Sequence, residues 1–129
     1  MYTSEKFYQI ALSRIPQIGV VNARRLISYI GSAEAIFQTS RVELQKIPHI
    51  GPILAESVFQ KLYLNEAALI LNACEQHQIS ILFYLDAAYP DRLKHIYDAP
   101  LVLYYQGTAD LNQERCLAVV GTRKATDYG

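Results

Sequence analysis

The sequence is poor in the residue types on which most catalytic and metal sites are built. Its 129 residues include no tryptophan, one methionine, two cysteines and three histidines. Cys74 and Cys116 form no CxxC pair, and no histidine stands at ligand spacing from either, so both are expected to be small buried hydrophobic residues. We therefore expect no metal site, no catalytic residue and no cofactor.

The chain also lacks an excess of charge of either sign. Twelve lysine and arginine residues balance twelve aspartate and glutamate residues. An even balance excludes attraction of a polyanion by the net charge of the whole protein. Any nucleic-acid site must therefore be a local arrangement of residues.

Long hydrophobic runs are absent as well. The longest, such as "ILFYL" and "LVLYY", are far shorter than the ~20 residues that span a bilayer. The N-terminal stretch "MYTSEKFYQIALSRI" has no basic start followed by an apolar region, as a signal peptide would. We expect a cytoplasmic protein without a membrane partner, and the 51% of hydrophobic residues predicts a packed core.

The first half of the chain has the periodicity of amphipathic helices. Apolar residues recur every three or four positions, and Pro16 and Gly19 interrupt the first such stretch. Gly31 stands where a C-cap is expected, and Ser32 stands at the next N-cap. A last helix is predicted to end near the polar cluster "EQHQ", and its apolar positions are Leu64, Ala67, Leu71 and Cys74.

An internal repeat lies within this helical half. A shift of 32 residues aligns "IPQIGVVNARRLI" (15–27) with "IPHIGPILAESVF" (47–59), with matching Ile, Pro, Ile, Gly and Ala. The pattern resembles the helix–hairpin–helix motif, in which a tight turn leads into a helix whose first amides hold a DNA phosphate without reading a base. On this interpretation Gly19, Arg24 and Arg25 of the first copy make weak DNA contacts.

Both copies depart from that motif. The glycine that usually precedes the matched glycine by two residues is replaced by Gln17 and His49, whose side chains crowd the approach of a phosphate. In the second copy Pro52 removes one amide donor and Glu56 repels phosphate. The alternative is a paired helical module, as in sterile-alpha-motif-like (SAM-like) folds, whose glycines serve packing.

The second half of the chain changes period. From Ile79 onward, "ISILFYL", "LVLYYQG" and "CLAVVG" are short apolar runs typical of buried strands. Such strands, separated by loops or short helices, predict an α/β architecture. We predict an all-helical SAM-like domain over residues 1–78, followed over residues 79–129 by the first strands of a Rossmann-like parallel sheet.

The end of the third run has the composition of a phosphate-binding turn. Gly121 permits a sharp turn after the strand, and Thr126 is suited to cap a following helix. Thr122, Arg123 and Lys124 place a hydroxyl and two cations beside the exposed amides. The stretch is not a GxGxxG dinucleotide fingerprint, because no second glycine follows at the required spacing. The alternative is an ordinary strand–helix turn with solvated basic residues.

The order of these features resembles the N-terminal part of the DprA (Smf) family of DNA-processing proteins. That family carries a Tyr-Pro…Leu…Asp-x-Pro…Leu…Gly stretch, then a strand, a Gly-Ser-Arg turn and a Thr/Ser-x-Tyr-Gly element. Thr122 replaces the serine here and keeps its hydroxyl. The other matching residues are Tyr89, Pro90, Leu93, Asp98, Pro100, Leu103, Gly107, Gly121, Arg123, Thr126, Tyr128 and Gly129.

The resemblance implies a Rossmann-like domain that binds single-stranded DNA in a basic pocket, forms homodimers and helps load the RecA recombinase in natural transformation. It implies that Arg123, and secondarily Lys124, contacts phosphate. It also implies that the chain is a fragment, because the family's domain continues beyond this turn. Two other classes stay open: a helical protein-interaction module, and a Rossmann-type nucleotide-binding enzyme, which the missing glycine fingerprint disfavours.

Overall fold

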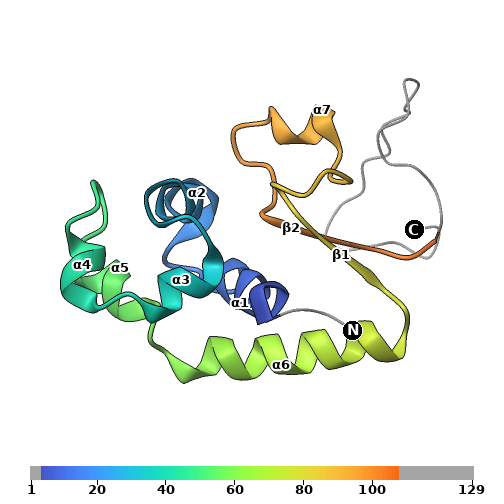
Figure 1. Ribbon diagram of the computed structural model, residues 1–129, viewed down its shortest axis with the longest axis horizontal. Helices are drawn as coiled ribbons and strands as arrows, with labels where there is room; N and C mark the ends of the chain where they lie inside the picture. The colour runs from blue at the N-terminus through green and yellow to red at the C-terminus, as the bar shows by residue number, and fades with distance from the viewer. Residues whose placement is uncertain (1–3, 108–129) are drawn as a thin grey trace, which may run out of the picture.

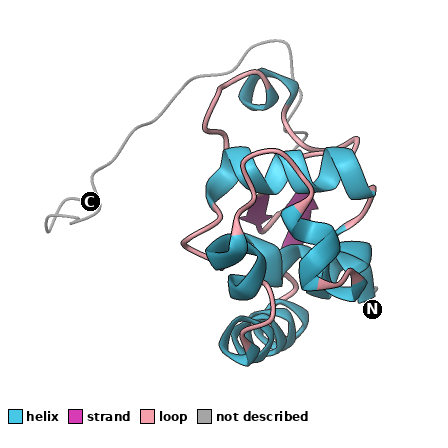
Figure 2. Cartoon of the chain, turned by 90° about the vertical axis from the view of Figure 1, so that its left-hand side faces the viewer, coloured by secondary structure: helices cyan, strands magenta, loops and turns pink. Residues whose placement is uncertain are grey.

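The computed structural model describes residues 4–107. The chain up to residue 76 is mainly helical, and two short strands follow the longest helix (Figure 1). Figure 2 shows how far helices dominate the described fold. In chain order the elements are α1 (Ser4–Ser13), α2 (Gly19–Ile30), α3 (Ala33–Gln38), α4 (Arg41–Gln45), α5 (Pro52–Ser57), α6 (Lys61–Gln76), β1 (Ser80–Phe83), α7 (Asp91–Lys94) and β2 (Val102–Tyr105).

Helix α1 lies at the centre of the described residues. It packs against α2, α3 and α6 and against both strands, and in Figure 1 it lies above the long helix α6. Ile10, Ala11 and Leu12 are consecutive in the sequence and all buried. Because consecutive helical residues point in different directions, α1 must be covered on more than one face.

The predicted end of α2 and start of α3 are confirmed. Gly31 has a φ of +113°, and its amide donates to the Ile27 carbonyl as a C-cap. The Ser32 hydroxyl accepts from the Ala35 amide at 3.2 Å, as an N-cap does. The Glu5 carboxylate adds two bonds that the sequence did not reveal, because it accepts from the first amides of α3, those of Ala33 and Glu34, at 2.9 Å each. Glu5 therefore ties α1 to α3.

Helix α6 forms where the apolar periodicity predicts a last helix. Its buried residues are Tyr63, Ala67 and Cys74, and it packs along α1. The helix ends at Gln76, within the predicted polar cluster. The opposite face of α6 is solvent-exposed, as Leu69 shows. The helix is therefore amphipathic in the sense that its sequence predicts.

The two strands are antiparallel, so the predicted parallel sheet is wrong for β1 and β2. Ser80 pairs with Tyr105 and Phe83 pairs with Val102 in a two-stranded sheet. Parallel strands need a connection that crosses the full length of the sheet. Here the connecting segment leaves and returns at the same end, where the Tyr84 amide donates to the Leu101 carbonyl at 2.9 Å. The third predicted strand, residues 116–121, lies outside the described residues.

One cluster of buried residues extends across the predicted boundary at residue 78. It joins α1, α2 and α6 to Ile81, Phe83, Leu101 and Val102 of the sheet region. Because α1 packs directly on both strands, the helices and the sheet share a core. The division into residues 1–78 and 79–129 stays a prediction, and a Rossmann-like arrangement of the second part is a proposal rather than a feature of the described residues.

Candidate nucleic-acid interface

The first hairpin joins α1 to α2 through a turn that starts at Ile15. The Ile18 amide donates to the Ile15 carbonyl at 3.3 Å, which closes the turn. Ile15 and Ile18 are buried, whereas Gln17 and Gly19 are exposed. Gly19 has a φ of +70°, a backbone conformation that favours glycine. The turn therefore presents the N-terminal end of α2 to solvent, as the helix–hairpin–helix interpretation requires.

The second hairpin joins α4 to α5 through an equivalent turn. The Ile50 amide donates to the Ile47 carbonyl at 3.1 Å. Here the residue with positive φ is His49, at +70°, whereas Gly51 is extended. Pro52 is the first residue of α5 and supplies no amide donor, as predicted from the sequence.

Glu56 makes the second hairpin less suited to phosphate than the first. Its carboxylate accepts from the Arg41 guanidinium in an exposed ion pair, and the same guanidinium lies 4.7 Å from the centre of the Phe59 ring. The charge of Arg41 is thus already paired with a carboxylate. Since α5 has only six residues, its weak dipole offers little compensation.

Arg24, a predicted DNA contact, points into the fold, toward the segment that connects the two strands. Its guanidinium lies 5.1 Å from the centre of the Tyr84 ring and donates to the Ala99 carbonyl at 3.4 Å, while its Nε is buried without a hydrogen-bond partner. Burial raises the pKa of the Tyr84 and Tyr89 phenols, and the charge of Arg24 partly opposes that rise. Arg24 therefore holds α2 against the segment that connects the strands.

Arg25 stays close to the surface of α2. One guanidinium nitrogen donates to the Asn22 side-chain oxygen at 2.6 Å, one helical turn earlier. The partner is neutral, so the charge of Arg25 is not offset by it. Gly19, Arg24 and Arg25 are thus not gathered at one point, because only Gly19 lies at the turn itself.

The segment between the strands, residues 84–101, contains five of the seven residues that match the family's Tyr-Pro…Leu…Asp-x-Pro…Leu…Gly stretch. Tyr89 is completely buried, and its hydroxyl donates to the Pro100 carbonyl at 2.6 Å. Asp86 accepts from the Phe83 amide at 2.9 Å and forms an ion pair with Lys6 of α1. These contacts fold the segment over the end of the sheet, which gives the motif tyrosine a structural role.

A cleft of about 320 Å³ lies between the first turn and β2. Gly19 lines it together with Arg14 and Tyr104. Arg14 could not be identified from the sequence, because its partner is remote in the chain: its Nε donates to a Glu66 carboxylate oxygen of α6 at 3.1 Å. A larger groove of about 470 Å³ is lined by Gln17, α5 and the start of α6, and its apolar side chains include Ile53 and Leu62.

The predicted phosphate-binding turn of Gly121, Thr122, Arg123 and Lys124 lies outside the described residues, as does Cys116. Within residues 4–107, Cys74 is buried, which raises the pKa of its thiol. The same residues contain no group of histidine, cysteine and acidic side chains that could hold a metal ion. No described helix combines the length and the apolar character that crossing a membrane requires.

Comparison with known proteins matches each half of the chain to a described family. Residues 9–68 match the helix–hairpin–helix motif, and residues 80–129 match the family described as DNA recombination-mediator protein A. Over 45 residues the chain is 47% identical to the DNA processing protein DprA of Streptococcus pneumoniae (strain ATCC BAA-255 / R6), and this stretch covers 35% of the chain and 16% of that protein. No solved structure matches the chain significantly. The matches confirm the resemblance to the DprA family and the helix–hairpin–helix repeat.

Proposed function

We propose that this protein binds single-stranded DNA through its phosphate backbone and takes part in DNA recombination. The observation that carries the proposal is the match of residues 80–129 to the DNA recombination-mediator family, because this stretch includes Gly121, Thr122, Arg123 and Lys124. Backbone amides at a strand end, together with a guanidinium, suit a phosphate and carry no base preference. Binding is therefore expected to be independent of sequence.

Arg123 is the residue to which we assign the main phosphate contact. A guanidinium can donate two parallel hydrogen bonds to one phosphate, whereas a lysine offers a point charge. Arg123→Ala is expected to weaken binding of a labelled oligothymidylate by roughly 1.5–3 kcal/mol, the range of a hydrogen bond to a charged group. Arg123→Lys is expected to recover part of the loss.

Fluorescence anisotropy at several salt concentrations measures this effect. Arg41→Ala is the matched control, because it also removes one guanidinium but from an exposed ion pair with Glu56 in the second hairpin. The control is expected to bind as the unsubstituted protein does. Equal binding by the Arg123→Ala variant would contradict the assignment, and failure of the unsubstituted protein to bind would contradict the proposed function itself.

The first hairpin supplies a second, weaker phosphate contact in this proposal. Its exposed Gly19 and the partly exposed Arg25 support that role, whereas the inward position of Arg24 does not. The resemblance to DprA also leads us to propose homodimer formation and assistance to RecA loading. The measurements for these are the mass of the protein in solution and the rate of RecA filament nucleation on coated single strands with and without it.

A helical protein-interaction module is the second candidate function. The groove of about 470 Å³ beside the second hairpin favours it, because Ile53 on its wall is 78% exposed and a large exposed apolar side chain often marks a contact surface. If the protein bound no DNA but Ile53→Asp abolished association with another protein, this candidate would replace the first.

A further inference from the structure

Most described cations with a defined partner are held by a carboxylate, but those of α2 are not. The cations that form ion pairs with acidic residues are Lys6, Arg14, Arg41, Lys46 and Lys94. Arg24 and Arg25 instead donate to a carbonyl and an amide oxygen, both neutral. Helix α2 therefore carries two positive charges that no described ion pair offsets, and a polyanion gains more from such charges than from cations already paired.

Tyr97, on the turn that Arg24 contacts, is an aromatic side chain that contributes no buried surface to the described core. It is 78% exposed, which is unusual for a tyrosine because its ring is largely apolar. Its ring makes none of the aromatic or cation–π contacts found among the described residues. Neighbouring Ile96 is also exposed.

The backbone around Tyr97 is nevertheless fixed. The Ala99 amide donates to the Ile96 carbonyl at 3.1 Å, which closes a turn around Tyr97. The Ala99 carbonyl accepts from Arg24, and the Pro100 carbonyl accepts from the buried Tyr89. An exposed ring on a fixed turn loses little conformational entropy when a ligand stacks on it.

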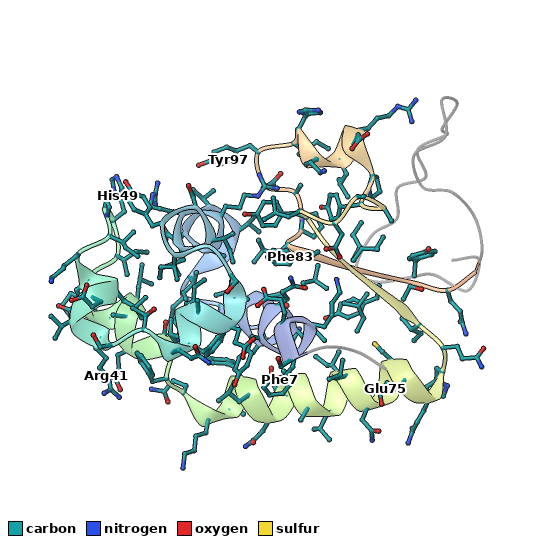
Figure 3. All side chains as sticks on the ribbon, viewed as in Figure 1. Phe7, Arg41, His49, Glu75, Phe83 and Tyr97 are labelled. Carbon is teal, nitrogen blue, oxygen red and sulfur yellow. The ribbon has the colours of Figure 1, made fainter. Side chains whose placement is uncertain are left out.

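The same contacts place this turn beside α2. Because Arg24 reaches the Ala99 carbonyl, the turn lies against α2, and Arg25 is the next residue along that helix. Figure 3 shows Tyr97 extending from its turn toward the side on which α2 lies. We call the region where this turn meets α2, with Tyr97 on the turn and Arg25 on the helix, the α2–loop junction.

We propose that single-stranded DNA crosses the α2–loop junction, with one base stacked on the Tyr97 ring and a neighbouring phosphate at Arg25. The proposal rests on the DNA-binding function proposed above and adds a contact separate from Arg123. Aromatic rings bind single strands by base stacking, which every base allows, and basic side chains follow the backbone. Asp98, next to Tyr97 in the sequence, carries a negative charge that disfavours phosphate, so we place the phosphate contact at Arg25.

The test uses the full chain and an oligothymidylate that carries one 2-aminopurine, whose fluorescence falls when it stacks on an aromatic ring. Tyr97→Ala is expected to weaken binding by roughly 5- to 140-fold, the equivalent of about 1–3 kcal/mol of stacking free energy, and to lose the quenching. Tyr97→Phe keeps the ring and should retain both binding and quenching. Tyr97→Leu keeps an apolar side chain without a ring and should behave as Tyr97→Ala does.

Salt dependence separates the two contacts of the junction. Arg25→Ala should lower the slope of log affinity against log salt by about 0.7, as expected for one lost single-strand phosphate contact. Tyr97→Ala should leave this slope unchanged, and Asp98→Asn should tighten binding. Leu69→Ala, which removes a side chain as exposed as Tyr97 from α6, is the control and should change nothing.

The outcomes distinguish this proposal from the one on which it rests. If Arg123→Ala weakens DNA binding but Tyr97→Ala does not, the junction is not a binding site although the protein binds DNA. If Tyr97→Phe fails as Tyr97→Ala does, stacking is refuted. If the unsubstituted chain binds no single-stranded DNA, both proposals fall. Because Tyr97 is exposed, equal unfolding temperatures for all Tyr97 variants are expected and confirm that each is folded.

Discussion

The two hairpins have the same turn hydrogen bond but differ in which residue takes the left-handed conformation. In both, the second isoleucine of the turn donates to the first, at 3.3 Å in one copy and 3.1 Å in the other. The residue with φ near +70° is Gly19 in the first copy and His49 in the second. The corresponding residues, Gly51 and Gln17, do not have positive φ. Identical motif residues thus form similar turns through different backbone conformations.

Pro52 is one sequence difference between the copies that acts on the turn. A proline disfavours the helical region for the residue before it, and Gly51 is accordingly extended, with φ of −90° and ψ of −176°. The chain then reverses direction with a left-handed residue earlier in the turn, at His49. In the first copy Val20 follows the glycine and imposes no such restriction. The two copies therefore differ both in the residue that follows the motif and in the turn residue that takes positive φ.

The helices that flank the two turns also differ. Helices α1 and α2 have 10 and 12 residues, whereas α4 and α5 have five and six. Longer helices have stronger end dipoles and bury more apolar surface. The first copy is therefore the one to which we assign the weak phosphate contact in our proposal, and we expect the second copy to serve mainly packing. The substitutions below test this contrast, from the largest expected effect to the smallest.

Removing the buried isoleucine at the end of each turn is expected to be the most damaging change. Ile18 is 2% exposed and Ile50 is 3% exposed. Ile18→Ala and Ile50→Ala should each lower the free energy of unfolding by about 2–5 kcal/mol through lost burial and a residual cavity. Urea denaturation followed by circular dichroism measures both. A far smaller loss for Ile50→Ala would show that the second hairpin lies outside the cooperative core.

Alanine in place of the matched glycine should separate the two copies. Gly19→Ala forces a side chain into a left-handed conformation and should cost about 1–2 kcal/mol of unfolding free energy. Gly51→Ala meets no such strain and has open space around the new side chain, so it should cost less than about 1 kcal/mol, mainly from a poorer N-cap. Thermal unfolding measures the difference, and equal costs would contradict the assigned backbone conformations.

Glycine at the third turn residue is expected to have opposite effects in the two copies. His49→Gly relieves a left-handed residue and should raise the free energy of unfolding by up to about 1 kcal/mol. Gln17→Gly relieves nothing and increases the entropy of the unfolded chain, so it should lower that free energy by about 0.5–1 kcal/mol. Stabilisation by both substitutions would mean that the turns are alike after all.

The ion pair of the second hairpin should matter least. The side chains of Arg41 and Glu56 are both more than half exposed, so solvent screens their attraction. Arg41→Ala should lower the free energy of unfolding by less than about 1 kcal/mol, including the loss of contact with the Phe59 ring. Measurements at low and high salt separate the two contributions, since salt weakens the exposed ion pair more than the close contact with the ring.

Local features of the helical half could be read from the sequence because they depend on near neighbours. The cap residues Gly31 and Ser32 act within one helical turn, and the apolar periodicity identifies α6. The repeat at Gly19 and Gly51 likewise predicts two turns of the same kind. These features follow from backbone sterics and from hydrogen bonds that span only a few residues.

Only the tertiary structure decided where the long-range partners lie. The basic pair in α2 indicated a phosphate contact, but Tyr84 and Ala99, far along the chain, draw Arg24 inward. The apolar strands were compatible with parallel or antiparallel pairing, and the folded segment around the buried Tyr89 returns the chain at the same end of the sheet. Side-chain direction and strand orientation depend on contacts between residues remote in sequence, which periodicity and local propensity do not encode.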